Sequence, residues 1–499
     1  MIDVTTPMHQ LKNWIANEWT EPRSTDAVEI TNPASGEVIG EAPMASLDDV
    51  DDAVQAAQDA FDGWRRTPAV DRARLLFRLQ ALVEENLDEL ARTVTIENGK
   101  TLEESRGEVL RTLENIEVAA GIPSLQMGQF SADIARDIDE AAVREPMGVF
   151  AQIGPFNFPS MVPFWFAPYA LATGNTYVIK PSPQTPLSQT RMMELVQQAG
   201  FPSGVINLVH GGADQAEALV THSLVRGISF VGTTRVARRI YELAGLHGKR
   251  VQAQGGAMNH LVIMPDANLA AAIPNLMGST FGCAGQRCLA GSVVVAQDDI
   301  YAEFRERLGS AAGSMRLGDG LDPVVDMGPV ISADAQTHII SAIDEASASG
   351  ATLVNDGRGA TAEGLAGGYW VGPTVVDDVT PDMRLMREEI FGPVVSLRRA
   401  GTLHEAIDMI DASPFGNAAS IYTSSGAAAR EFAARVNIGN VGINVGVAAP
   451  MAFFPFAGRK SSFFGDLHGQ AGDAVRFFTD PKVIVSRWPG SSDGRDPWD

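Results

Sequence analysis

The sequence predicts an α/β protein built from two parallel sheets with helices packed against them. Short apolar runs alternate with helix-length amphipathic stretches through the middle of the chain, which is typical of a parallel sheet. A second group of apolar runs follows nearer the C-terminus, and 499 residues suffice for two or three domains. The predicted strands are residues 149–153, 176–179, 205–209, 227–231 and 261–264 in the first unit, and 293–296, 371–376 and 394–397 in the second.

Helical periodicity dominates the first 120 residues. Ser46 is a favourable N-cap, and apolar residues recur from Val50 to Phe61 at spacings of four, three and four. Two further helices are predicted over residues 70–97 and 102–120.

Two segments outside these units have strand-like patterns. Residues 130–144 are polar and alternate weakly, and the tail carries apolar residues from Val475 to Val485. Either segment could form an edge strand that pairs with another chain. The Ser-, Gly- and Asp-rich end after Trp488 is predicted to be loosely ordered.

The chain is strongly acidic. It has 38 Lys and Arg against 61 Asp and Glu, so its formal charge is −23. This surplus argues against a nucleic-acid partner, because neutralising phosphates requires a basic face. Only six of the basic residues are lysines. A GC-rich genome would explain the arginine excess, but the acidic, lysine-poor composition also indicates a halophilic protein of a high-salt cytoplasm.

Three observations indicate a cytoplasmic protein without a membrane span. Two cysteines, Cys283 and Cys288, cannot supply a disulfide framework for so long a chain. The first ten residues lack a basic patch followed by an apolar run, so no signal peptide is predicted. Residues 146–179 carry no charge and could span a bilayer, but four prolines interrupt them, and we expect buried core.

The two cysteines are also the first candidates for chemistry. A Cys-x4-Cys pair without a second pair is a poor zinc motif, and the histidines lack metal-ligand spacing, so no metal site is predicted. We expect Cys283 to be a buried free thiol. For Cys288 the adjacent Arg287 favours a reactive thiolate, because a nearby cation lowers the pKa of a thiol.

Five motifs follow one another along the chain: Gly154-Pro-Phe-Asn-Phe-Pro159, Lys180-Pro-Ser182, Phe230-Val-Gly-Thr-Thr234, Gly285-Gln-Arg-Cys288 and Glu389-Ile-Phe-Gly-Pro393. Together they resemble the aldehyde dehydrogenase superfamily over nearly the whole chain. Five further strings are His247-Gly-Lys-Arg-Val-Gln252, Asn259-His260, Met264-Pro-Asp-Ala-Asn268, Phe281-Gly282 and Phe463-Phe-Gly-Asp466. Through them the chain is most similar to the CoA-acylating methylmalonate-semialdehyde dehydrogenases.

The resemblance implies a Rossmann-like NAD-binding domain, an α/β catalytic domain and a small β extension. The boundaries expected from it are residues 1–123 and 144–253 for the NAD-binding domain, 254–467 for the catalytic domain, and 124–143 with 468–499 for the extension. Such an extension joins subunits in the resembled family, so a homodimer or homotetramer is expected.

The resemblance also implies three catalytic positions. Cys288 would attack the aldehyde carbon, and loss of a hydride to NAD would leave a thioester. Asn157, with the Cys288 N–H, would stabilise the oxyanion; without the family match it would be a turn asparagine. Gln254 stands where hydrolytic relatives carry a water-activating glutamate, and an amide cannot take that proton. The thioester is therefore expected to react with CoA as co-substrate, unless another carboxylate replaces the base.

Six residues match positions that hold NAD in the resembled family. Gly232 and Thr233 lie between a predicted strand and a predicted helix, where main-chain N–H groups favour phosphate, although the Gly-x-Gly-x-x-Gly fingerprint is absent. Met258 and Pro183 depart from the family's usual lysine and glutamate, which leaves NADP as an alternative. The six residues are Phe156, Lys180, Gly232, Thr233, Glu389 and Phe391.

Arg111 and Arg287 match arginines that hold the substrate carboxylate in the resembled family. Two guanidiniums can bind one carboxylate bidentately. For Arg111, an ion pair with Glu108 or Glu114 on its own helix is an equal alternative. The expected reaction is the NAD-dependent oxidation of methylmalonate or malonate semialdehyde to propionyl-CoA or acetyl-CoA, with release of CO2.

Three other functions compete with this one. A hydrolytic NAD(P)-dependent aldehyde dehydrogenase could act on another small aldehyde. A silent relative could bind cofactor in a structural role, but the presence of both Asn157 and Cys288 argues against it. An RNA-binding role is opposed by the acidic balance and by the lack of an RNA-binding signature.

The net charge leads to a salt-dependence prediction. NAD, CoA and the semialdehyde are all anionic, so a charge of −23 opposes their approach. We expect the initial rate of NADH formation to rise with KCl concentration, because added ions screen this repulsion. Inhibition by molar KCl would contradict the halophilic interpretation.

Overall fold

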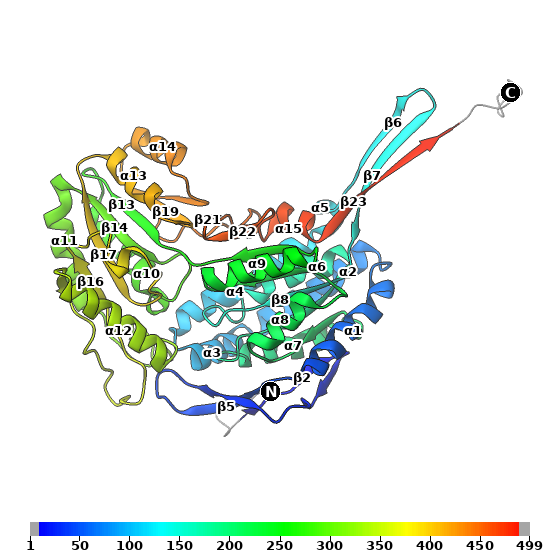
Figure 1. Ribbon diagram of the computed structural model, residues 1–499, viewed down its shortest axis with the longest axis horizontal. Coiled ribbons are helices and arrows are strands. Elements are labelled where there is room, and N and C mark those ends of the chain that lie inside the picture. Colours follow the sequence, from blue (N-terminus) through cyan, green and yellow to red (C-terminus); the bar gives the residue numbers. More distant parts are fainter. Residues whose placement is uncertain (1–8, 489–499) are drawn as a thin grey trace, which may run out of the picture.

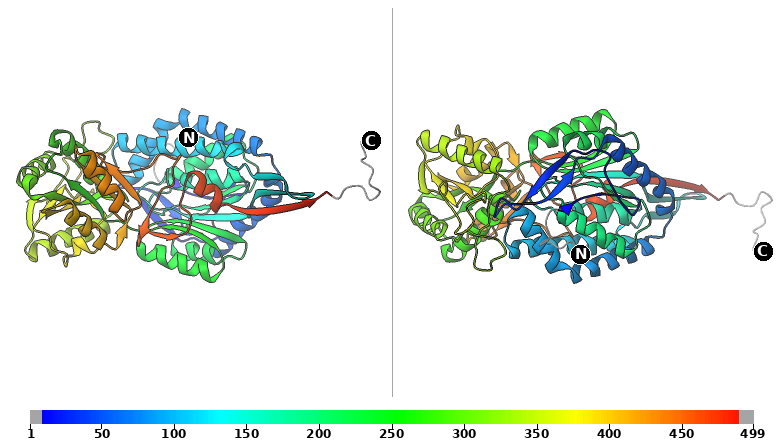
Figure 2. Two further views of the ribbon diagram at one scale, coloured as in Figure 1. Left: turned by 90° about the horizontal axis from the view of Figure 1, so that it is seen from above. Right: turned by 90° about the horizontal axis from the view of Figure 1, so that it is seen from below.

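The computed structural model describes residues 9–488. Most of the segment assessed for a signal peptide, and the end after Trp488, lie outside this range. Two main sheets form two lobes, and a three-stranded arm projects from the first lobe (Figure 1). Figure 2 shows the second lobe and the arm at opposite ends of the first. The predicted α/β class with two sheets is confirmed.

The first lobe is built on an eight-stranded sheet of order β22-β12-β11-β8-β9-β10-β2-β3. Its five central strands run parallel, and antiparallel strands close both edges. The central strands are β8 (Val149–Ile153), β9 (Thr176–Lys180), β10 (Ile206–Leu208), β11 (Val225–Val231) and β12 (Arg250–Gln254), and the edge strands are β2 (Asn13–Ile15), β3 (Glu18–Thr20) and β22 (Phe463–Gly465).

Helices cover both faces of this sheet because its strands are apolar on both sides. Val149 and Ala151 pack with one group of helices, whereas Phe150 between them packs with the other. The first group is α1 (Leu47–Trp64), α8 (Ala213–Thr221) and α9 (Thr234–Leu246). The second is α2 (Ala69–Glu85), α3 (Leu87–Asn98), α4 (Leu102–Ala120), α5 (Ile122–Leu125), α6 (Ala167–Thr173), α7 (Leu187–Ala199) and α15 (Ala471–Phe477).

The second lobe has a seven-stranded sheet of order β15-β16-β17-β14-β13-β19-β20, parallel except for β15. Helices α10 to α12 pack on one face and α13 and α14 on the other. Its elements are β13 (Asn259–Ile263), α10 (Leu269–Phe281), β14 (Gly291–Gln297), α11 (Asp298–Gly313), α12 (Ala333–Ala348), β15 (Thr352–Asn355), β16 (Thr374–Asp377), β17 (Val394–Ala400), α13 (Leu403–Ala412), β19 (Ala418–Tyr422), α14 (Gly426–Arg435) and β20 (Asn440–Ile443).

The arm consists of β6 (Gln129–Ala135), β7 (Ile138–Pro146) and β23 (Thr479–Arg487), all antiparallel. Strands were predicted in both segments, but the tail prediction begins too early. Val475 and Phe477 lie in α15, where they pack into the core of the first lobe, so their spacing reflects a buried helix face.

Other differences from the sequence predictions concern helix bounds, sheet membership and missed strands. Residues 70–97 form two helices, because the chain turns at Asn86. Residues 261–263 of the predicted strand 261–264 lie in β13, which pairs with β14 and β19 in the second sheet. Strand β12 was missed because buried polar residues interrupt its apolar pattern. The short strands β1 (His9–Gln10), β4 (Ala27–Thr31), β5 (Val38–Pro43), β18 (Phe415–Gly416) and β21 (Arg459–Lys460) were missed as well, and so were β2, β3, β15, β19, β20 and β22.

The uncharged stretch 146–179 is buried core, as predicted: it contains β8, α6 and most of β9. Across residues 9–488, no helix is both long and apolar enough to cross a membrane.

The lobes meet at the connection between α3 and α4. A Cβ on Gly328 would lie 1.9 Å from the main-chain oxygen of Gly99, and one on Gly320 would lie 2.2 Å from that of Lys100. The Leu102 N–H donates to the Gly320 carbonyl at 2.8 Å. These close contacts, which require glycine, place the α3–α4 connection directly against the second lobe.

Candidate active site

A left-handed turn precedes the candidate nucleophile. Cys283, Ala284 and Gly285 have φ values of 53°, 51° and 69°. Such φ values cost on the order of 1–3 kcal/mol for each non-glycine residue, so the surroundings must hold the turn. At Gly285 a Cβ would lie 2.0 Å from the Gly392 carbonyl oxygen, which explains the glycine. Cys283 is a buried free thiol, as predicted.

Three side-chain amides fix the main chain around Cys288. Asn259 Nδ2 donates to the carbonyls of Cys288 and Ala290 at 2.9 and 2.8 Å, and Asn417 Nδ2 donates to Cys288 O at 2.7 Å. Gln286 Oε1 accepts from the Ile331 N–H at 3.0 Å. The sequence predicts no role for Asn259 beyond its place in a motif, and no motif includes Asn417.

Asn157 reaches the same segment from the first lobe. It is 5% exposed, and its Nδ2 donates to the main-chain oxygen of Gln286 at 3.0 Å, two residues before Cys288. The structure therefore brings the predicted oxyanion donor beside the predicted nucleophile. An amide nitrogen carries two hydrogens, so one remains for a further acceptor.

The predicted low thiol pKa of Cys288 is wrong. Burial, followed by the charge of Glu389, raises the pKa of Cys288 to about 12, and the opposing effect of Arg287 is smaller. Desolvation disfavours a thiolate more than one guanidinium stabilises it. The thiol is therefore protonated at neutral pH in this structure, and attack on a substrate requires that its proton be removed.

A cavity of about 240 Å³ joins Cys288 to both predicted substrate arginines. Arg111 is half-buried and pairs with Glu114 at 2.7 Å, so it both lines the cavity and makes one of the two ion pairs considered. Arg287 Nη2 lies 3.2 Å from Cys283 Sγ. Phe158, Met161, Trp165 and Phe456 supply apolar walls. The cavity can hold a small molecule with an anionic end.

Gln254 lies at the end of β12 among main-chain groups. It is 5% exposed, and its Nε2 donates to the Phe456 carbonyl at 3.5 Å. The carboxylate whose charge acts on Cys288 is instead Glu389. Burial raises the pKa of Glu389 to about 7, although the Ala257 N–H donates to Glu389 Oε1 at 2.8 Å.

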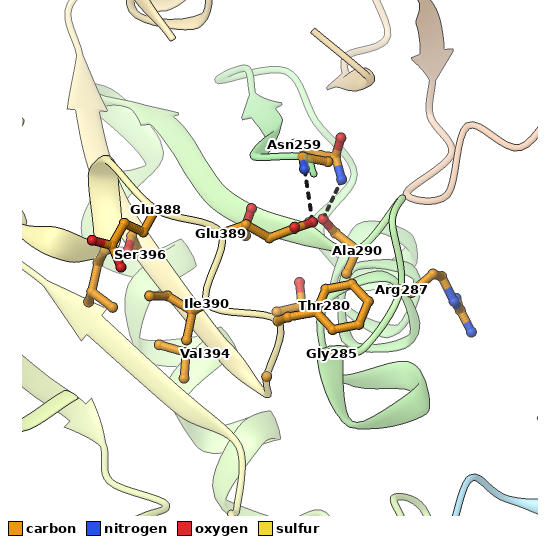
Figure 3. Close-up of a pocket in the computed structure, with 16 residues that line it drawn as sticks. Asn259, Thr280, Gly285, Arg287, Ala290, Glu388, Glu389, Ile390, Val394 and Ser396 are labelled. Atoms are coloured by element: carbon orange, nitrogen blue, oxygen red, sulfur yellow. Dashed lines mark hydrogen bonds between the residues drawn. The ribbon is translucent and has the colours of Figure 1, made fainter. Parts of the chain in front are cut away.

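Glu389 and Phe391 lie near each other beside a small pocket of about 30 Å³ (Figure 3). Figure 3 shows Glu389 directed toward Asn259 and Ala290, while Arg287 extends away from this pocket. The rings of Phe391 and Phe156 meet edge to face, with centroids 5.8 Å apart. The structure thus brings three of the predicted cofactor residues, Phe156, Glu389 and Phe391, together near the segment that carries Cys288.

Lys180 ends strand β9 and is 3% exposed. Its ammonium donates to the carbonyls of Pro181 and Gly211 at 3.0 and 2.7 Å, and burial lowers its pKa to about 8. A buried ammonium at the carboxyl end of a parallel strand is placed where α/β sheets bind ligands.

Gly232 and Thr233 connect β11 to α9, as predicted. Thr233 is the N-cap of α9, yet within residues 9–488 its side chain makes no capping hydrogen bond. The first N–H groups of α9 therefore lack this internal acceptor and can face an anion. Across the described part of the chain, no group of three or more His, Cys, Asp and Glu side chains could hold a metal ion.

A parallel α/β lobe whose asparagine amide reaches the segment of a partly buried cysteine on the second lobe is the arrangement of a thiol-dependent enzyme. The chain belongs to the aldehyde dehydrogenase family, whose profile matches residues 19–484. The resemblance found from the motifs is confirmed.

Its relatives share nearly the full length. Malonate-semialdehyde dehydrogenase 2 of Geobacillus kaustophilus (strain HTA426) is 47% identical over 485 residues, which cover 97% of this chain and 100% of the relative. The crystal structure of methylmalonate-semialdehyde dehydrogenase from Oceanimonas doudoroffii is 41% identical with a TM-score of 0.96, covering 98% of this chain and 100% of that one. A structure from Sinorhizobium meliloti 1021, solved with NAD, is 40% identical, has the same TM-score and covers the same shares.

The Arg111–Glu114 pair leads to a prediction about substrate affinity. If Arg111 binds a substrate carboxylate, that carboxylate must compete with Glu114, so Glu114→Gln should lower the KM for a semialdehyde acid about two- to fivefold with kcat unchanged. The measurement is steady-state NADH formation. Glu103→Gln, which removes an exposed charge from the same helix, should leave KM unchanged. An equal change in KM for propanal, which has no carboxylate, would contradict the competition.

Proposed function

We propose that this enzyme oxidises malonate or methylmalonate semialdehyde with NAD and transfers the acyl group to CoA, releasing CO2. One observation carries the proposal: a single cavity joins Cys288 to Arg111 and Arg287. Two guanidiniums beside a nucleophile suit an aldehyde with a carboxylate at its far end. The malonate- and methylmalonate-semialdehyde relatives support the same substrate class.

The residues present fit NAD. The uncapped start of α9 suits a pyrophosphate, and Lys180 and Glu389 offer a donor and an acceptor for ribose hydroxyls. A relative solved with NAD supports this cofactor over NADP. When bound, NAD would supply the hydride acceptor for the oxidation.

The protein's own residues would act in a fixed order. Arg111 and Arg287 bind the substrate carboxylate, which places the aldehyde carbon at Cys288 Sγ. The Cys288 thiol must lose its proton before it attacks, and Glu389 is a carboxylate whose charge acts on that thiol. The thiolate adds to the carbonyl, and the free hydrogen of Asn157 Nδ2 donates to the oxyanion. Loss of such a donor typically lowers kcat by about 10²–10³.

Loss of a hydride converts the thiohemiacetal into a thioester on Cys288. The carboxylate β to this thioester leaves as CO2, and the resulting enolate takes up a proton to give the acetyl or propionyl thioester. Gln254 cannot activate water, so the thiol of CoA attacks the carbonyl and releases Cys288.

The decisive experiment is a product analysis by mass. With malonate semialdehyde, NAD and CoA, we expect acetyl-CoA, CO2 and NADH in equal amounts, because each turnover yields one of each. Without CoA, NADH formation should stop after about one equivalent per active site, since the thioester persists. Complete and equally fast NADH formation without CoA would reject the acylating reaction and favour the hydrolytic alternative.

Gln254 offers a separate prediction. Gln254→Glu places a carboxylate at the end of β12, where hydrolytic relatives carry their base, so release of free acid without CoA should increase about a hundredfold, the lower end of the range for general-base catalysis. The measurement is steady-state acid release with CoA omitted. Unchanged acid release in a folded variant would show that this position does not control the fate of the thioester.

We also propose that the arm joins subunits into a homodimer or homotetramer. Its strands and their surroundings expose large apolar side chains, among them Phe130 at 70%, Val483 at 63% and Val485 at 60%. An exposed apolar three-stranded arm is the kind of surface that another chain covers.

A further inference from the structure

Buried side chains donate hydrogen bonds to the main chain of the loop that follows β8 and carries Asn157. Asn98 Nδ2 donates to the Phe156 carbonyl at 3.0 Å. Gln189 Nε2 donates to the Pro159 carbonyl at 2.6 Å. These contacts come from α3 and α7, so side chains from two neighbouring helices help to fix the conformation of the loop after β8.

A buried ion pair forms the centre of this support. The side chains of Lys100 and Glu108 are both 0% exposed, and Lys100 Nζ lies 2.8 Å from Glu108 Oε2. The same ammonium donates to the main-chain oxygen of Asn157 at 2.5 Å and lies 4.0 Å from the centre of the Phe158 ring. Glu108 Oε1 accepts from the N–H groups of Ser160 and Met161 at 2.8 and 3.1 Å.

A contribution to folding stability does not explain why Lys100 and Glu108 are charged. A buried ion pair is often no more stabilising than apolar side chains of similar volume, because both ions lose their hydration. Here, however, each charge binds the main chain of the loop. Lys100 fixes the carbonyl of Asn157, and Glu108 fixes the two N–H groups that follow it along the loop.

Lys100 also lies where the two lobes touch. Its carbonyl oxygen faces Gly320, and that of Gly99 faces Gly328, at distances that leave no room for a side chain. The main chain of Lys100 therefore rests on the second lobe, which carries Cys288, while its side chain holds the loop of the first lobe, which carries Asn157.

We infer that Lys100 and Glu108 are positioning residues that set the distance from the Asn157 amide to the oxyanion formed at Cys288. The inference rests on the proposed roles of Asn157 and Cys288. Neither Lys100 nor Glu108 needs to touch the substrate for this effect, because they act through the main chain of residues 157–161.

A double-mutant cycle tests the inference on the full-length enzyme with NAD. Asn157→Ala should lower kcat about 10²–10³-fold through loss of a donor. Lys100→Met should lower kcat up to about 100-fold through misplacement of that donor, with the KM for NAD unchanged. If Lys100 acts through Asn157, the double variant should stay within about threefold of Asn157→Ala alone. Losses that multiply in the double variant would overturn the inference.

Three further variants control for misfolding and for general effects of substitution. Lys100→Met combined with Glu108→Gln leaves no unpaired charge in the core and should show the same kcat loss in a folded protein. Lys100→Arg keeps the charge and should recover part of kcat. Arg106 lies in α4, as Glu108 does, and forms an exposed ion pair with Asp88 of α3. Arg106→Met removes this pair and should leave kcat unchanged. Wild-type kcat in the folded Lys100→Met/Glu108→Gln variant would overturn the inference.

The substrates separate this inference from the proposed function. An oxyanion forms from any aldehyde, so the cycle is run with malonate semialdehyde and with propanal. If the wild type oxidises only propanal, the proposed substrate is wrong, and the cycle with propanal still decides the role of Lys100. If the wild type oxidises both, non-additive losses with both substrates are the expected result.

Discussion

The hydrogen bond from the Asn157 amide to the Gln286 carbonyl joins the two lobes two residues before Cys288. In the proposed reaction the nucleophile lies on one lobe and the oxyanion donor on the other, so they can cooperate only if the lobes keep a fixed separation. The glycine contacts at the α3–α4 connection and the amides of Asn259 and Asn417 hold the two sides of this bond.

The charges near the site show how an acidic protein can receive anions. Arg111 is paired with Glu114 and the buried Lys100 with Glu108, so neither cation is free. In the proposed reaction a substrate carboxylate displaces Glu114 from Arg111, and Arg287, which lines the same cavity, adds a second guanidinium. The net charge of −23 therefore describes the surface more than the cavity.

Sequence patterns predicted the elements whose environment is uniform. Strands β8 and β9 are buried on both faces and read as apolar runs, whereas β12 carries Gln252 and Gln254 at buried positions and gave no such run. Motifs located Cys288, Asn157 and the arginines. They could not show that burial overrides Arg287 at the thiol, or that Lys100 meets Asn157, because both depend on contacts between segments distant in sequence.

Strand β22 pairs with β12 at one edge of the first sheet, although it follows the whole second sheet along the chain. During synthesis the ribosome therefore makes every strand of the second lobe before the strand that completes the first. The N-terminal lobe cannot finish folding ahead of its neighbour, as domains made in sequence generally do. A chain that stops within the second lobe leaves β12 as an open edge, ready to pair with another unfinished chain.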